Sequence, residues 1–349
     1  MEQEWKKSVS SIKPKGVLVW ILGLTLLLLA AMVISLFVGR YPISWQTFLD
    51  LIGLGNGDSS QLEQSQVIFF QVRVVRILAA VMIGAALSMA GSAYQGIFRN
   101  PMVSPDILGA SSGAGFGAAL AISIGINALG VQILAFLFGI AAVLFAYLLS
   151  LAIGRRGGGM TLILVLTGMV VSSLFTALIS IVKLVGDPYD TLPAITFWLM
   201  GGLSYVTSYD LLVMLIPFLA GGITLLVLRW HLNVLSLGEE EANALGVNTM
   251  RLRGIVILCA TLLSTSAVAI GGMIGWVGLI VPHFTRMLVG PDYHRLLPTA
   301  MLVGSIFLLL VDDVARGLFA LELPLGILTA ILGAPFFLCL LFRGKRGFL

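Results

Sequence analysis

Charge is scarce in this 349-residue sequence: Lys, Arg, Asp and Glu make up 10% of it, whereas 59% of the residues are hydrophobic. Soluble domains carry about 25% charged residues. The composition therefore argues against a soluble enzyme, and it excludes a disordered chain, which would be polar and charge-rich. A transmembrane barrel would show short alternating segments instead of long apolar runs. We predict an all-α polytopic membrane protein.

Cysteine, histidine and nucleotide-binding motifs are equally sparse. The only two cysteines, Cys259 and Cys339, lie in separate apolar segments, so no disulfide framework is expected. No phosphate loop of the form G-x-x-x-x-G-K-[ST] occurs, so any ATP hydrolysis must come from a partner. The three histidines are scattered, and no histidine or cysteine pair suggests a metal site. We expect no catalytic, cofactor-binding or metal site in this chain, and no nucleic-acid partner.

Long apolar segments are abundant, and a helix that crosses a bilayer needs about 20 such residues. The longest runs break at turn-like residues 127–130 and 271–272. The stretch 191–209 contains Pro193 and two glycines, so it is interpreted as a half-helix or re-entrant element. We predict ten spans, at about 17–38, 77–98, 107–126, 131–153, 160–182, 211–228, 254–271, 275–288, 296–311 and 325–342.

Ten spans place both termini on one side of the membrane, and the positive-inside rule identifies that side as the cytoplasm. Fifteen of the 20 Lys and Arg residues then lie inside, and five lie outside: Arg40, Arg73, Arg76, Lys183 and Arg316. The chain divides into a cytoplasmic tail (1–16), a single transmembrane domain (17–342) and a second cytoplasmic tail (343–349). The first apolar run exceeds the 7–15 residues of a signal peptide, so it is interpreted as a retained span.

Two other functional classes were weighed against this composition. No Asp, Glu, Lys or Arg lies at the centre of a predicted span, where ion-coupled carriers usually place such residues. A secondary transporter is therefore less favoured, although broken helices can bind ions through backbone carbonyls. A membrane-embedded enzyme would need a catalytic constellation, and none is visible.

Small residues recur every three or four positions along the second predicted span, at Gly84, Ser88, Gly91 and Ser92. Such residues let helix backbones approach closely, so helix packing is the favoured interpretation. The alternative is that hydroxyl groups polarise a pathway, in which case they include Ser88, Ser92, Ser111, Ser112, Ser172, Ser173 and Thr176.

The longest predicted cytoplasmic loop, 232–253, carries a short amphipathic pattern. Glu239, Glu240 and Glu241 suit the positive end of a helix. Ala242 and Leu245 offer an apolar side, and Gly246 can end the helix. The acids would be repelled by anionic lipid, so docking on another protein is favoured.

Six motifs, in this order, resemble the permease subunits of the type II ATP-binding-cassette importers for iron siderophores, haem and cobalamin. They are R-V-V-R-I-L-A-A (73–80), Q-G-I-F-R-N-P-M-V-S-P-D-I-L-G-A-S-S-G-A (95–114), F-W-L-M-G-G-L (197–203), L-N-V-L-S-L-G-E-E-E-A-N-A-L-G-V (232–247), G-W-V-G-L-I-V-P-H-F-T-R (275–286) and L-P-L-G-I-L-T-A-I-L-G-A-P-F-F (323–337). The resemblance runs from about residue 20 to the end. It implies a ten-span permease, working as a homodimer in a bacterial or archaeal cytoplasmic membrane.

The resemblance also implies partners: two cytoplasmic ATPase subunits, which bind ATP and magnesium, and an extracytoplasmic substrate-binding protein. ATPase coupling falls on Glu239, Glu240, Glu241, Ala242, Leu245 and Gly246. Docking of the binding protein falls on Arg73, Arg76 and Arg316. The cytoplasmic gate falls on Asn100, Met102 and Thr161. One departure is that R-V-V-R lacks the proline often found between the two arginines of this motif.

The resemblance leaves the substrate open. A ferric siderophore is expected by default, because siderophores are the largest class in the family. Cobalamin, haem, and molybdate or tungstate are the alternatives.

Overall fold

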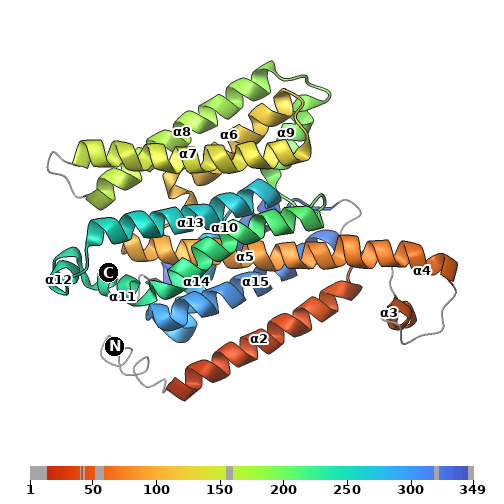
Figure 1. The fold of residues 1–349 in the computed structure, drawn as a ribbon, viewed down its shortest axis with the longest axis horizontal. Coiled ribbons are helices and arrows are strands. Elements are labelled where there is room, and N and C mark those ends of the chain that lie inside the picture. Colours follow the sequence, from red (N-terminus) through yellow and green to blue (C-terminus); the bar gives the residue numbers. More distant parts are fainter. Residues whose placement is uncertain are drawn as a thin grey trace.

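A computed structural model describes residues 14–39, 41, 44–51, 59–154, 160–317 and 322–344, and within them the chain is a bundle of helices (Figure 1). Most of the two predicted tails, Arg40, and the 155–159 segment lie outside the described residues. The first half forms α2 (Pro14–Phe37), α3 (Trp45–Leu51), α4 (Ser59–Gln66), the π-helix η1 (Val67–Arg73), α5 (Val74–Ile97), the 3-10 helix η2 (Pro105–Leu108), α6 (Ala110–Ser123), α7 (Ala128–Gly154) and α8 (Met160–Val185).

The second half forms α9 (Thr191–Met200), α10 (Ser208–Val227), α11 (Arg229–Leu237), α12 (Glu239–Ala244), α13 (Thr249–Gly271), α14 (Val277–Val289), α15 (Tyr293–Gly317) and α16 (Leu325–Gly344). Each of the ten predicted spans coincides with a helix: α2, α5, α6, α7, α8, α10, α13, α14, α15 or α16. Among the described residues, seven helices are long and apolar enough to cross a membrane by themselves. The helical, polytopic class is therefore confirmed, whereas the count of ten crossings stays a prediction.

Two helices extend beyond the spans predicted for them. The helical stretch that contains α5 begins at Ser59, so Arg73 and Arg76 lie inside it and not before it. Helix α15 continues to Gly317 and includes Arg316. The predicted spans stop where charged residues begin. The helices continue through these charged residues, because their side chains have partners within the protein.

Helix α5 lies at the centre of the bundle and packs against α10, α13, α14 and α15 (Figure 1). A Cβ atom on Gly84 would lie 2.2 Å from the carbonyl oxygen of Gly304 in α15, and one on Gly91 would lie 1.8 Å from that of Gly278 in α14. No side chain fits between these backbones. The glycines therefore set the distances between α5 and two of its neighbours.

The serines of the second and third spans are also packing residues. Ser88 and Ser92 are fully buried and Ser111 is nearly so, which confirms the packing interpretation for these three. Ser173 and Thr176 differ, because they are exposed on α8 and donate to carbonyl groups of their own helix. The hypothesis of a hydroxyl-lined pathway is left with these α8 residues and with Ser112 and Ser172, which are half-buried.

Backbone groups left free at three helix ends, after α9, after α13 and before α16, form hydrogen bonds with one another. Gly201 ends α9 with a φ of +73°, and Gly272 ends α13 with a φ of +68°. The N–H of Gly202 donates to the carbonyl of Gly271 at 2.8 Å, and the N–H of Leu325 donates to that of Gly201 at 2.9 Å. Irregular backbone at membrane depth is tolerated when protein groups satisfy it. The predicted half-helix is thus confirmed as α9, joined by hydrogen bonds to α13 and α16.

A buried ion pair joins α5 to α15. The Arg76 Nε lies 3.0 Å from both carboxylate oxygens of Asp312, and its Nη2 lies 2.9 Å from one of them. The Arg76 Nη1 also donates to Glu322 at 3.0 Å. Ser204 donates to the same Glu322 oxygen from the loop after α9. These contacts connect four segments that are distant in sequence.

Arg316 continues this network toward α2. Its Nε lies 3.5 Å from Asp312, its Nη2 pairs with Asp313, and Nη2 also donates to the carbonyl of Ser35 at 2.8 Å. Arg73 donates to two backbone carbonyl groups at and after the end of α2. The docking role expected for these three arginines requires an exposed basic rim, but all three are buried. They hold partners inside the chain.

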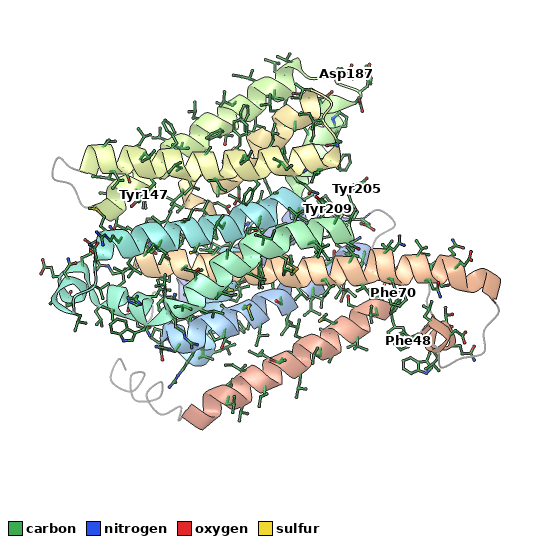
Figure 2. All side chains as sticks on the ribbon, viewed as in Figure 1. Phe48, Phe70, Tyr147, Asp187, Tyr205 and Tyr209 are labelled. Carbon is green, nitrogen blue, oxygen red and sulfur yellow. The ribbon has the colours of Figure 1, made fainter. Side chains whose placement is uncertain are left out.

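Aromatic side chains surround the end of the bundle away from α12. Figure 2 shows Tyr205 and Tyr209 close together at the start of α10, where both are exposed. Phe48 of α3 packs against Phe69 of η1 with ring centroids 5.8 Å apart. Because Tyr and Trp are enriched at membrane–water interfaces, the exposed tyrosines indicate where the bundle leaves the membrane.

Replacing Arg76 with Met should destabilise the protein by about 3–5 kcal/mol, because Asp312 would be left buried without its main partner. Loss of the monodisperse gel-filtration peak after heating in detergent measures the effect. Lys183→Met is the control, since it removes a charge that has no ion pair among the described residues. Arg76→Met with Asp312→Leu should recover most of the loss. Equal stability of the Arg76 and Lys183 variants would refute the structural role.

A single methyl group at Gly91 should also destabilise the bundle, by about 1–3 kcal/mol, because it would overlap the backbone of α14. Gly23→Ala on α2 is the matched control, since a Cβ there meets no atom within 4 Å. The same heating assay compares the two variants. If Gly91→Ala melts with the parent protein, the close contact between α5 and α14 is not as described.

Candidate functional site

A cavity of about 840 Å³ lies at the end of the bundle where α11 and α12 are drawn (Figure 1, left). Three segments surround it: the connection after α5, the first two turns of α8, and the corner between α11 and α12. Its lining residues are Phe98, Arg99, Asn100, Val103, Ile107, Thr161, Leu162, Val165, Leu237, Gly238, Glu239, Glu240 and Glu241. The structure thus brings two predicted gate residues, Asn100 and Thr161, to the same cavity as the three predicted coupling acids.

The connection after α5 is a tight turn held by hydrogen bonds. Arg99 adopts a φ of +48°, and the side-chain oxygen of Asn100 accepts from the N–H of Met102 at 2.9 Å. Gln95, in the last turns of α5, donates to the carbonyl of Val103 at 3.4 Å. Met102 itself is exposed and does not line the cavity. The third predicted gate residue is therefore not among the residues that line this cavity.

The predicted short helix in the 232–253 loop is confirmed as α12. Its first turn carries Glu239, Glu240 and Glu241, whose charges complement the positive end of the helix. Gly246 follows with a φ of +79°, and its N–H donates to the carbonyl of Asn243 at 3.0 Å. A left-handed glycine after the last turn is a common helix stop.

The surface that α12 offers to a partner differs from the expected one. Ala242 is fully buried and belongs to the main hydrophobic core, so it cannot form an apolar surface with Leu245. Leu245 is 58% exposed, and Glu240 and Glu241 are exposed as well. The buried alanine lets α12 lie close to the body of the protein. The surface that α12 exposes consists of the two acids, Leu245 and the C-terminal turn.

One residue that the sequence did not single out joins these parts. The Nη2 of Arg253, near the start of α13, pairs with the Glu239 carboxylate and lies 3.5 Å from the Thr161 hydroxyl. The Arg253 side chain is only 3% exposed. In the sequence it was one of fifteen basic residues assigned to the inside. The sequence offered one sign of this ion pair: Arg253 lies within the first turns of a helix, 14 residues after Glu239.

Helix α8 leaves one face uncovered along its whole length. Leu162, Leu166, Val170, Leu174 and Leu184 are all exposed on it. In water such a stripe would mark an interaction site. In a membrane it faces either lipid or another protein.

Comparison with known proteins agrees with the motifs. The profile of the FecCD transport family matches residues 27–343. The molybdate import system permease protein MolB of Haemophilus influenzae is 46% identical over 329 residues, covering 93% of this chain and 96% of its own length. A probable iron chelatin transport system permease protein of Helicobacter pylori is 41% identical, covering 82% and 86%.

A solved structure, described as an inward-facing conformation of a metal-chelate type ABC transporter, matches with a TM-score of 0.82 and 44% identity. The match covers 94% of this chain and 99% of that one. The fold, the order of the motifs and the family profile therefore coincide over nearly the whole sequence. The chain belongs to the FecCD transport family of ABC importer permeases.

Proposed function

We propose that this chain is the membrane-spanning subunit of an ATP-driven importer in a bacterial or archaeal cytoplasmic membrane, with both termini in the cytoplasm. Two copies would enclose the pathway, and each would bind one ATPase subunit at α12. A substrate-binding protein would dock at the opposite end, where α9 and α10 meet. The chain would perform no chemistry, and it would switch between outward-open and inward-open states as the ATPases bind and hydrolyse ATP.

The observation that carries this proposal is the shared cavity at the α12 end. Asn100 and Thr161, the proposed gate, line the same cavity as the acids of α12. A partner that moves α12 therefore changes the wall of the space that the gate borders. A coupling site and a gate that border one cavity suit an importer whose movement is driven by a separate ATPase subunit.

Exposed faces of α8 and α16 support the proposed pairing of two copies. Ile331, Leu332 and Phe342 of α16 are exposed, as is the apolar stripe of α8. Ser173 and Thr176 lie within that α8 stripe. We place α8 beside the pathway, because hydroxyl groups bonded to their own helix add polarity without introducing a charge.

The docking role of Arg73, Arg76 and Arg316 stays a prediction. Each side chain is buried and bonded within the chain. To meet carboxylates of a binding protein, these arginines would have to exchange internal partners for external ones. In the arrangement described, they contribute by holding the ends of α2, α5 and α15 in place.

For the substrate we propose molybdate or tungstate first. The support is the molybdate permease of Haemophilus influenzae, which matches along nearly its full length at 46% identity. A ferric chelate, the default expected from the sequence, is the second candidate, and it is supported by the iron chelatin permease of Helicobacter pylori.

Reversing the charges of Glu240 and Glu241 together, to Lys, should abolish co-purification of the ATPase subunit and ATP-dependent transport. Both acids are exposed on α12, so the change should leave the fold intact. Glu63→Lys is the control, because Glu63 is an exposed acid on α4 at the opposite end (Figure 1). Undiminished ATPase binding by the double variant would refute docking at α12.

Elemental analysis of the cognate binding protein, purified without added metal, tests the substrate. Molybdenum or tungsten at one atom per protein is the expected result, and iron would replace the first candidate by the second. Uptake of labelled molybdate into vesicles should require the binding protein, the ATPase and ATP. Uptake without ATPase or ATP would favour a secondary transporter and refute the importer.

A further inference from the structure

We infer that Arg253 transmits the movement of the ATPase-docking helix α12 to the gate residue Thr161. The inference rests on the proposed function, because it takes α12 as the docking helix and Thr161 as part of the gate. Arg253 is a positioning residue here, since it touches neither substrate nor nucleotide in the proposed mechanism.

The geometry of the guanidinium group supports this role. One nitrogen, Nη2, pairs with Glu239 of α12 and also lies 3.5 Å from the Thr161 hydroxyl of α8. Glu239 and Thr161 both line the cavity, so Arg253 bridges two parts of its wall. Within the described residues, no other side-chain hydrogen bond or ion pair joins α12 or α13 to α8. A displacement of Glu239 therefore acts on Thr161 through a single shared atom.

The bonding of Arg253 is also incomplete in this arrangement. Its Nε is buried and has no hydrogen-bond partner, and the contact with Thr161 is at the long limit of a hydrogen bond. A buried donor without a partner raises the free energy of the state that contains it. An arrangement that gave Nε a partner would remove this cost, and the inference requires such a second state.

The two residues of the ion pair differ in exposure, and this difference suits transmission of movement from α12 toward α8. The Glu239 side chain is 43% exposed, whereas that of Arg253 is 3% exposed. A partner on α12 can reach Glu239 or its neighbours from the surface. The guanidinium behind it is enclosed, and its other contact is with the Thr161 hydroxyl of α8.

A distance measurement between the two copies tests the inference without a transported substrate. Cys259 and Cys339 are replaced by Ser, and a spin label is placed at Leu162→Cys, an exposed position next to Thr161. The assembled complex is measured with and without ATP and vanadate. In the parent, ATP should shift the distance populations. In Arg253→Gln the ATP-dependent shift in the distance populations should be smaller by about 5-fold or more, which is the lower limit of typical coupling between linked sites. Binding of the ATPase should be retained.

Arg251→Gln is the matched control, because Arg251 is an exposed arginine on the same turn region of α13. It should behave as the parent does. Arg253→Lys should restore much of the shift, because one ammonium can replace the single nitrogen that makes both contacts. A purely structural role would instead lower heat stability in all Arg253 variants without separating ATPase activity from gate movement.

Two further variants cover the case in which Arg253→Gln fails to fold. Glu239→Gln removes the charge at one end of the bridge, Thr161→Val removes the hydroxyl at the other end, and both keep the side-chain shape. Each should reduce the shift, and the double variant should lose no more than the stronger single one, because both act through Arg253. An unchanged shift, or additive losses, would overturn the inference. If no distance between copies or no ATPase binding is found in the parent, the proposed function fails instead.

Discussion

The other features of the structure depend on one constraint: the backbone of α5 lies in direct contact with the backbones of α14 and α15. With carbonyl oxygens of α14 and α15 occupying the space where Cβ atoms would lie on Gly91 and Gly84, the central helix can neither rotate nor slide without a collision. Packed interiors of this kind respond in discrete steps and not continuously. The two ends of α5 are thereby fixed relative to α15 at one side and to the cavity at the other.

The second organising condition is that polar groups away from water must find partners in the chain. At one end this condition collects two arginines, Arg76 and Arg316, and three acidic residues, Asp312, Asp313 and Glu322. At the other end it encloses Arg253 between α12 and α8. In the middle it pairs the broken backbone of α9 with those of α13 and α16. Among the described residues, the buried charges therefore each have a partner at a definite position in the fold.

Local features of the sequence predicted local structure well. Hydropathy located ten helices, glycine pairs located the breaks after α9 and α13, and the acid run followed by Gly246 located α12. Six ordered motifs also identified the family, which the profile match confirms. These features depend on neighbouring residues, and neighbours in sequence are visible without a structure.

Features that depend on distant partners were not visible. Arg76 was expected at an exposed rim because its partner, Asp312, lies 236 residues away. Ala242 was expected on the docking surface because the helix pattern does not say which face meets the body of the protein. Arg253 was counted only as one of the basic residues on the cytoplasmic side. Asp312 and Asp313, four and three residues before Arg316, were the overlooked sign of an internal network.

The hydrogen bonds of Ser35 have a consequence for how the chain is made. Helix α2 is synthesised before the helices it packs on, α5 and α15, and Ser35 bonds to Asp313 and Arg316, which lie 278 and 281 residues later in the sequence. Helices of such proteins insert in the bilayer before they associate. Helix α2 must therefore remain in lipid without its main neighbour until α15 has been synthesised. Premature termination anywhere before α15 would leave α2 inserted but unassembled, and open to recognition by membrane quality control.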